Sequence, residues 1–345
     1  MLRIALLGAG RIGQVHARSI VDHPESTLAV ISDVVASAAE TLAATVGASV
    51  STVDKILGDP SIDAVLIATS TDTHASLIER ASAAGKAVLC EKPVDLSLER
   101  ALACQRATAN ATAPVMVGFN RRFDPSFSAL KSAFDAGEIG KGELLSITSF
   151  DPAPPPLEYV RVSGGLFRDM MIHDIDIACW LYGSTPDRVT AVGSCTVDPA
   201  IGDAGDVDTA VATLAWEDGR LAVIRNSRRA AYGYDQRIEL LGAEGMLAAA
   251  NQLENTVQKL TATGQLSAKP EYFFLERYAR AFRLEWAAFV QAVLANGKGN
   301  NTLPVSLQDG INALAVAEAA TVSRRTGQTV SLSGTTLQVS SGQAG

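Results

Sequence analysis

Two polar residues four positions apart, Asp169 and His173, have the side chains and the spacing that proton transfer requires. In a helix, residues at i and i+4 share one face, so the carboxylate can orient and charge the imidazole. Histidine is also the side chain best matched to general-base work near neutral pH. The pair therefore predicts a site that deprotonates a substrate hydroxyl. Two other interpretations stay open: an exposed helix surface, and a metal site formed by His173, Asp174 and Asp176.

A second chemical group is the lysine in Glu91-Lys92-Pro93, which follows a predicted strand over residues 86–91. Open α/β sheets bind their ligands at the carboxyl ends of the strands. A lysine there can hold a substrate hydroxyl as a fixed positive charge or a hydrogen-bond donor. We expect Pro93 to stiffen the turn, and the sequence does not decide whether the peptide bond before it is cis or trans. The alternative is a surface lysine after a strand.

The third feature is a G-x-G-x-x-G motif at Gly8, Gly10 and Gly13, placed between a predicted strand and a predicted helix. The first glycine permits a tight turn, the second lets the backbone approach a pyrophosphate, and the third lets the helix pack on the strand. The helix N-terminus adds free N–H groups and a partial positive charge. The motif predicts a dinucleotide site with its pyrophosphate over these glycines.

Asp33 lies at the end of the next predicted strand, at the ~20-residue distance where an acid accepts hydrogen bonds from the adenosine ribose. A carboxylate there repels a 2′-phosphate, and no arginine follows it directly, so the sequence favours NAD over NADP. The alternative is that Asp33 only ends a strand. Further cofactor contacts are expected from Arg11, Ile12, Thr69, His74, Glu91 and Lys92.

Strands and helices that position these residues alternate through the first third of the chain. Predicted strands are 2–7, 28–33, 64–69, 86–91 and 115–119, and predicted helices are 12–23, 37–46, 74–84 and 97–110. Such alternation gives a parallel sheet covered on both faces. We therefore predict an α/β fold whose residues 1–120 form a doubly wound, NAD-binding Rossmann domain.

The pattern changes after residue 119. A Pro-rich loop at 151–156 precedes a helical segment at 165–182, and alternating runs follow at 188–197, 208–216, 221–226, 236–242 and 246–250. Glu217-Asp218-Gly219 is typical of a hairpin turn. Helical patterns return at 274–296 and 306–325. We predict an α+β domain over residues 121–332 with a large open, mostly antiparallel sheet that binds substrate and oligomerises, and a flexible tail at 333–345.

Bulk composition narrows the function classes. The net charge of −8 argues against nucleic acid, which needs a basic surface, and favours a small metabolite as the partner. No apolar run approaches the ~20 residues of a membrane span, and no signal peptide is recognisable, so we expect a cytoplasmic protein. Four cysteines lie outside any C-x-x-C pair and read as buried free thiols: Cys90, Cys104, Cys179 and Cys195.

Taken together, the glycine motif, Glu91-Lys92-Pro93 and the segment 164–176 resemble the Gfo/Idh/MocA oxidoreductase family over nearly the whole chain. The segments 197–208, 226–240 and 273–278 look like the members that oxidise inositol. The resemblance implies NAD-dependent oxidation of a cyclic polyol, most closely myo-inositol to 2-keto-myo-inositol. It also implies a homotetramer, often with the open sheet in the interface.

The resemblance further implies roles for three residues. His173 would be the general base that deprotonates the hydroxyl as its carbon gives hydride to the nicotinamide, Asp169 would orient His173, and Lys92 would hold the reacting oxygen. Contacts to other hydroxyls are expected from Arg122, Asp151 and Tyr234, although Tyr232 or Tyr234 could equally be core residues. Other functions stay open: oxidation of scyllo-inositol or an aldose, and a non-catalytic NAD-binding sensor.

Overall fold

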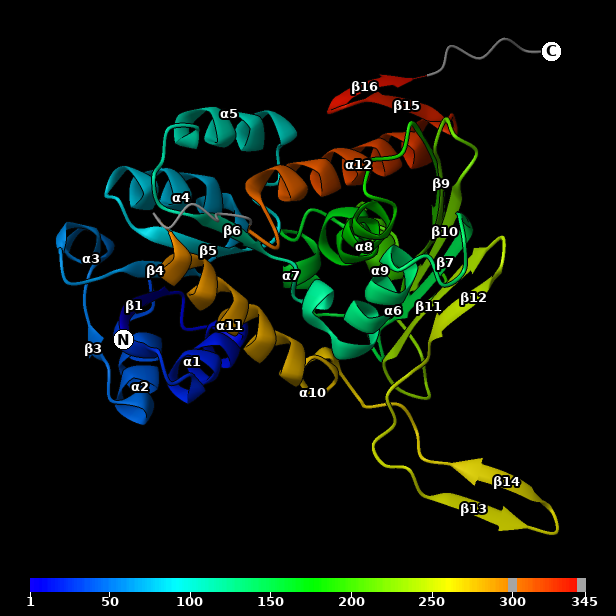
Figure 1. Ribbon diagram of the computed structural model, residues 1–345, viewed down its shortest axis with the longest axis horizontal. Helices are drawn as coiled ribbons and strands as arrows, with labels where there is room; N and C mark the ends of the chain where they lie inside the picture. Colours follow the sequence, from blue (N-terminus) through cyan, green and yellow to red (C-terminus); the bar gives the residue numbers. More distant parts are fainter. Residues whose placement is uncertain (297–302, 340–345) are drawn as a thin grey trace. The chain divides into compact units, whose positions relative to one another are not determined.

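The computed structural model describes residues 1–296 and 303–339, and Figure 1 follows the chain from β1 to β16. Its internal contacts divide the chain into two units. The first unit contains Met1–Phe123 and Ala279–Ile311, and the second contains Asp124–Tyr278 and Asn312–Gly345. The domains predicted at 1–120 and 121–332 are continuous in sequence, unlike these units, and their bounds stay a prediction. The sequence did not predict that Ala279–Ile311 returns to the first unit.

The first unit contains a six-stranded parallel sheet in the order β3-β2-β1-β4-β5-β6. The strands are β1 (Leu2–Leu7), β2 (Ser26–Ser32), β3 (Ser49–Val50), β4 (Ala64–Ile67), β5 (Ala87–Glu91) and β6 (Val115–Gly118). Within this unit, α1 (Arg11–Asp22) and α2 (Ala36–Val46) lie on one side of the sheet, and α4 (His74–Ala83) and α5 (Leu98–Thr108) on the other (Figure 1). Because helices cover both faces, β4 and β6 are buried at every position.

The predicted doubly wound sheet is thus confirmed, with strand and helix ends within a few residues of those expected. Strand order reverses beside β1, so the carboxyl ends of β1 and β4 flank the crevice where such sheets bind ligands. The short strand β3 and the short helix α3 (Val53–Gly58) were not predicted. Both are too short to show a clear periodic pattern.

The second unit contains an eight-stranded sheet in the order β12-β11-β7-β10-β9-β8-β15-β16. Its strands are β7 (Gly142–Phe150), β8 (Arg188–Ser194), β9 (Thr209–Ala215), β10 (Leu221–Ser227), β11 (Asp235–Gly242), β12 (Gly245–Ala249), β15 (Val330–Ser333) and β16 (Thr336–Val339). Only β7 and β10 pair in parallel. The mostly antiparallel sheet is confirmed, and the predicted turn joins β9 to β10 with Gly219 at φ +92°. Strand β7 was missed.

Helix α8 (Ile172–Tyr182) packs on β7 and β10, and a five-residue π-helical turn, η3 (Phe167–Met171), precedes it. The other helices of this unit's first segment are α6 (Pro125–Asp135), α7 (Leu157–Val160), α9 (Pro199–Asp203) and α10 (Phe274–Arg277). A hairpin of β13 (Gln258–Thr261) and β14 (Gly264–Ser267) is exposed at every residue.

Three expectations need correction. The single helix expected at 274–296 is two helices, α10 and α11 (Ala279–Ala295), because Tyr278 leaves the helical conformation. Helix α12 (Leu307–Thr326) matches its prediction, but the expected tail forms β16 up to Val339, and residues 340–345 lie outside the described part. All four cysteines are free, yet Cys179 and Cys195 are only half-buried.

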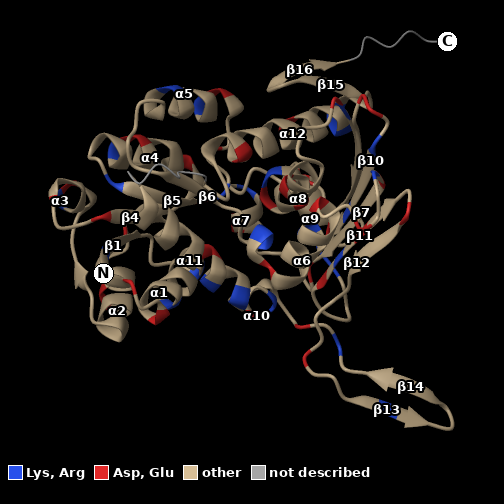
Figure 2. Cartoon of the chain, viewed as in Figure 1, with Lys and Arg blue, Asp and Glu red and all other residues tan. Residues whose placement is uncertain are grey.

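Positions of Lys and Arg are interspersed with positions of Asp and Glu along the chain in both units (Figure 2). No helix within residues 1–296 or 303–339 has the length and apolar character of a membrane span.

Candidate active site

The glycine motif runs from the tight turn after β1 into the first turn of α1, and two of its positions tolerate no side chain. Gly8 has φ +101°, and a Cβ there would lie 2.3 Å from the carbonyl oxygen of Ala68. A Cβ on Gly13 would lie 2.0 Å from the carbonyl oxygen of Gly8. Both distances are far below van der Waals contact, so β1, β4 and α1 can approach this closely only with glycine at both positions.

Gly10 differs because nothing in the described residues comes within 4 Å of a Cβ placed on it. It is the N-cap of α1, no side chain caps the helix, and the first-turn residues Arg11 and Ile12 follow directly. Free N–H groups and the helix dipole therefore face open space at Gly10. This is the arrangement that a dinucleotide pyrophosphate requires, so the loop fits NAD.

Asp33 follows β2 and is tied to the glycine loop. Its Oδ2 accepts a hydrogen bond from the N–H of Ala9 at 2.6 Å, and its Oδ1 accepts one from Val35 at 2.8 Å. An ionised carboxylate has further lone pairs, so these bonds leave capacity for ribose hydroxyls. Asp33 thus anchors the loop, and its role as the ribose acid stays a prediction.

Thr69 and His74 lie beyond β4, next to the residues that follow β5. Thr69 Oγ1 is 2.6 Å from Oγ1 of Thr73. The ring of His74 is buried, with Nδ1 2.8 Å from the carbonyl oxygen of Pro93 and Nε2 3.2 Å from that of Thr69. Burial lowers the pKa of His74, although both carbonyls oppose the shift. His74 therefore joins the two loops at the sheet's carboxyl edge, and its direct contact with the cofactor stays a prediction.

Glu91 is the last residue of β5, and Lys92 follows it at the same sheet edge. The peptide bond from Lys92 to Pro93 is cis. The carboxylate of Glu91 lies 2.7 Å from Nε2 of His16, a residue of α1. Burial would raise the pKa of Glu91, but the hydrogen bond and charge of His16 and the charge of Lys92 hold it below its usual range. Lys92 is thus placed beside an ionised carboxylate.

The sequence interpretation missed two members of this cluster, His16 and Glu285. Glu285, on α11, is fully buried, and neither carboxylate oxygen has a hydrogen-bond partner among the described residues. Burial raises the pKa of Glu285 well above its usual range, and the charge of Glu91 acts in the same direction. The sequence signal that could have identified Glu285 is an acidic residue within the apolar pattern of a predicted helix.

In the second unit, Asp169 lies within the π-helical turn η3, and His173 is the second residue of α8. Asp169 Oδ1 accepts a hydrogen bond from the hydroxyl of Tyr159 at 2.7 Å, and Oδ2 lies 3.4 Å from Nη2 of Arg228. Both Asp169 and His173 are partly exposed. Single π turns inside helices occur often at functional sites, because they re-aim side chains.

The metal interpretation loses support here because Asp174 has structural partners. Asp174 is fully buried and accepts hydrogen bonds from Ser149 Oγ at 2.5 Å and from Asn226 Nδ2 at 2.7 Å. It therefore ties α8 to β7 and β10. Across residues 1–296 and 303–339, no group of His, Cys, Asp and Glu has the arrangement of a metal site.

The three residues expected to contact other substrate hydroxyls have different partners within the protein. In the first unit, the buried Arg122 donates to Asp309 Oδ1 at 3.1 Å and to the carbonyl of Pro304 at 3.2 Å. In the second unit, Asp151 follows β7 in the Pro-rich loop, and its N–H donates to Ser227. Tyr234 is only 5% exposed and packs edge-on against Phe273 and Tyr278, so its ring belongs to an aromatic cluster.

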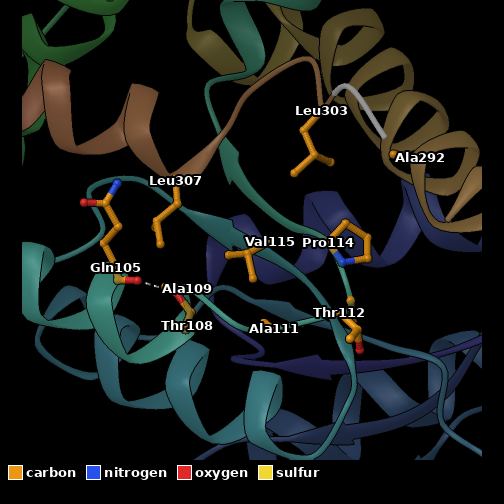
Figure 3. A pocket seen from close by; sticks show the side chains of 11 residues that line it. Gln105, Thr108, Ala109, Ala111, Thr112, Pro114, Val115, Ala292, Leu303 and Leu307 are labelled. Carbon is orange, nitrogen blue, oxygen red and sulfur yellow. Dashed lines mark hydrogen bonds between the residues drawn. The ribbon is translucent and has the colours of Figure 1, made fainter. Parts of the chain in front are cut away.

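Figure 3 shows a pocket of about 290 Å³ in the first unit, lined by Gln105, Thr108, Ala109, Ala111, Thr112, Ala113, Pro114, Val115, Ala292, Leu303 and Leu307. Val115 is the first residue of β6, so this pocket lies at the amino end of the strand. The glycine loop and Lys92 lie at the carboxyl edge, where parallel sheets bind ligands. The pocket is therefore separate from the cofactor site.

Comparisons with known proteins agree with this geometry. Residues 2–119 match the family model "Oxidoreductase family, NAD-binding Rossmann fold", and residues 127–248 match the "GFO/IDH/MocA C-terminal domain". The chain is 47% identical to an inositol 2-dehydrogenase of Rhizobium meliloti over 319 residues, which cover 92% of this chain and 96% of that protein.

The chain is also similar in fold to solved structures of inositol dehydrogenases. A myo-inositol dehydrogenase from Corynebacterium glutamicum is 43% identical with a TM-score of 0.91, over 96% of this chain and 99% of that one. A scyllo-inositol dehydrogenase from Lactobacillus casei, solved with NAD(H) and scyllo-inositol, is 32% identical with a TM-score of 0.89, over 96% and 99% of the two chains.

Proposed function

Because this chain belongs to the Gfo/Idh/MocA family of NAD-binding oxidoreductases, we propose that it oxidises myo-inositol at C2 to 2-keto-myo-inositol. The observation that carries the choice of substrate is the 47% identity, over nearly the full length, to a protein named inositol 2-dehydrogenase. The chemistry is supported by Asp169 and His173, which have the types and spacing of a proton-transfer pair.

NAD is held by the residues at the carboxyl edge of the first sheet. The pyrophosphate takes the open space at Gly10 above the N-terminus of α1, and Asp33 accepts hydrogen bonds from the ribose hydroxyls. Bound NAD supplies the acceptor for the hydride that leaves the alcohol carbon.

Three side chains act on the alcohol itself. His173 takes the hydroxyl proton, which is the only proton the oxidation releases from oxygen. Asp169 orients the imidazole and stabilises its charge once the proton has moved. Lys92 donates a hydrogen bond to the same oxygen and offsets the negative charge that develops there. Arg122 and Asp151 are proposed to contact other ring hydroxyls, and Tyr234 is proposed to contact one through its hydroxyl.

Oxidation of scyllo-inositol is the second candidate, favoured by the likeness to the Lactobacillus casei enzyme. An aldose is a third. A sensor that binds NAD without turnover is the candidate from a different class. It has no need for a base, whereas this chain has Lys92, Asp169 and His173 at the positions where the family resemblance expects them.

The test is a substrate panel read by NADH absorbance. Purified protein and NAD are mixed at mildly alkaline pH with myo-inositol, scyllo-inositol or glucose, and we expect the highest kcat/KM for myo-inositol. A higher value for another polyol would replace the substrate proposal. Absence of NADH with every polyol would favour the sensor.

We propose that the protein is a homotetramer that uses the outer face of the second sheet. Exposed apolar side chains pair across neighbouring strands there: Val192 with Val211, and Leu144 with Leu221 and Leu241. A patch of this kind is typical of an interface. Light scattering after size exclusion should give four chains per particle, and Val211→Lys should lower that number. A monomeric wild type would contradict the proposal.

We place the working compartment in the cytoplasm. All four cysteines are free thiols, which is usual in a reducing compartment. Cell fractionation with an antibody to the protein tests this placement, and recovery in the membrane or secreted fraction would overturn it.

A further inference from the structure

Arg228, directly after β10, is a cation buried in the second unit. Its side chain is 2% exposed, and its Nη2 lies 3.4 Å from Asp169 Oδ2 and 3.6 Å from Asp206 Oδ2. A guanidinium stays charged at any pH the protein meets, and a buried charge is stable only beside opposite charge. Its Nε has no hydrogen-bond partner among the described residues. The two carboxylates therefore account for the placement of Arg228.

The sheet fixes where this cation lies. The N–H of Arg228 donates to the carbonyl of Asp208 at 2.8 Å, which continues the pairing of β10 with β9. Asp206 lies just before β9, so the same strand pair holds both the cation and its second carboxylate. Neither group can move far without breaking sheet hydrogen bonds.

Asp206 in turn holds the start of the π-helical turn. Its Oδ1 accepts a hydrogen bond from the N–H of Leu166 at 2.9 Å. A Cβ on Gly165 would lie 2.8 Å from that same oxygen, so the carboxylate fits closely against the backbone. Arg228 thus links the rigid sheet to both ends of the short segment 165–169.

The opposite oxygen of Asp169 is held from another element. The hydroxyl of Tyr159, on α7, donates to Oδ1 at 2.7 Å. Asp169 is therefore held between a neutral donor on one side and a buried cation on the other. Removing Arg228 would take away the cation that the carboxylates of Asp169 and Asp206 share, and this would weaken the hold on Asp169.

We infer that Arg228 is a positioning residue, which fixes the carboxylate of Asp169 so that it can orient His173 for proton transfer. The inference rests on the proposed function, because it takes Asp169 and His173 as the proton-transfer pair. Arg228 touches neither substrate nor cofactor in this scheme and acts through Asp169.

The test compares Arg228→Gln with Arg229→Gln, which changes the exposed arginine one position further on. We expect Arg228→Gln to lower kcat by about 10- to 100-fold, since misplacing a reacting group by an ångström costs on the order of 10². The KM for NAD should stay within about twofold, and Arg229→Gln should behave as wild type. Arg228→Lys, which keeps the charge but loses the planar fork, should recover part of kcat.

A double-mutant cycle with Asp169→Asn separates positioning from general structural damage. If Arg228 acts through Asp169, kcat of the double variant equals that of Asp169→Asn alone. Multiplied losses, or a loss of Tm with kcat unchanged, would overturn the inference. If Arg228→Gln does not fold, Arg228→Lys takes its place in the cycle under the same criteria.

Failure of the proposed function would look different, because the wild type would then form no NADH with any polyol. If turnover occurs but Asp169 and His173 are not the proton-transfer pair, His173→Ala and Asp169→Asn would both keep wild-type kcat, whatever Arg228 does. Loss of kcat in those two variants, together with wild-type kcat in Arg228→Gln, would reject only the role of Arg228.

Discussion

The carboxylate of Asp33 accepts a hydrogen bond from the backbone N–H of Ala9 at 2.6 Å, across 24 positions of the chain. One side chain therefore anchors the glycine loop, and in the proposed function the same carboxylate would also accept hydrogen bonds from the adenosine ribose. Charge and hydrogen bonding can be separated here, because an asparagine keeps an acceptor oxygen while it loses the charge.

We predict that Asp33→Asn relaxes the preference for NAD over NADP but keeps the hydrogen bond that anchors the glycine loop at Ala9. Asp33→Ala should relax the preference and also lose that hydrogen bond. The neutral amide no longer repels a 2′-phosphate. Losing the bond to Ala9 as well should raise the KM for NAD by about 10-fold, from the 1–3 kcal/mol of an unpaired buried donor. The measurement is kcat/KM for both cofactors, and an unchanged ratio in both variants would show that Asp33 is not the ribose acid.

Gly10 and Gly13 should respond differently to a methyl group. Gly10→Ala puts a Cβ into open space, so Tm should hold while the Kd for NAD rises at least about 10-fold from lost pyrophosphate contacts. Gly13→Ala puts a Cβ 2.0 Å from the Gly8 carbonyl, so the fold itself should lose several kcal/mol, about the cost of a severe core clash.

Thermal melts and NAD titration measure the two effects, and Gly58→Ala, at a helix glycine with open space around it, is the matched control. Tight NAD binding by Gly10→Ala would place the pyrophosphate elsewhere.

His173→Ala should lower kcat by roughly 10²- to 10⁴-fold, the usual contribution of a general base. Lys92→Ala should lower it by roughly 10²- to 10³-fold, as for a lost oxyanion donor. The Kd for NAD should barely change for either variant, because neither side chain is needed to hold the pyrophosphate or the ribose. Steady-state kinetics with isothermal titration tests both statements, and a lost NAD affinity would mean that these side chains mainly hold the cofactor and not the substrate hydroxyl.

Glu285 should destabilise the protein increasingly as pH rises. Burial raises its pKa in the folded state well above the value of about 4.5 that the unfolded chain has, so above that pH the unfolded state releases a proton that the folded state keeps. The free energy of unfolding therefore falls from about pH 4.5 upward.

Glu285→Met should remove this slope and stabilise the protein by about 1–3 kcal/mol at pH 8, the range for removing a buried unpaired polar group. Denaturant unfolding at pH 5 and pH 8 gives the comparison, with the surface variant Glu40→Met as control. A variant less stable than wild type at pH 8 would mean that Glu285 has a partner when the protein is in solution.

Features that depend on nearby residues could be predicted from the sequence. The glycine spacing, the acid after β2 and the alternation of strands with helices predicted the first unit almost element by element, because each depends on residues within a few positions of one another. The π-helical turn at Asp169 was not predictable, since its sequence fits an ordinary helix. Strand β7 was missed because it is one nine-residue run between loops, with the uneven burial of a central strand.

The tertiary structure alone decided which residues from distant segments of the chain come into contact. The sequence determined that Asp169 and His173 share a helical segment and that Gly8, Gly10 and Gly13 mark a turn from a strand into a helix. Only the folded chain brings Arg228 to Asp169 across 59 positions and His16 to Glu91 across 75. Local patterns report backbone preference, whereas the partner of a buried charge is set by which strands pair and which helices cover them. That choice depends on burying the whole core at once.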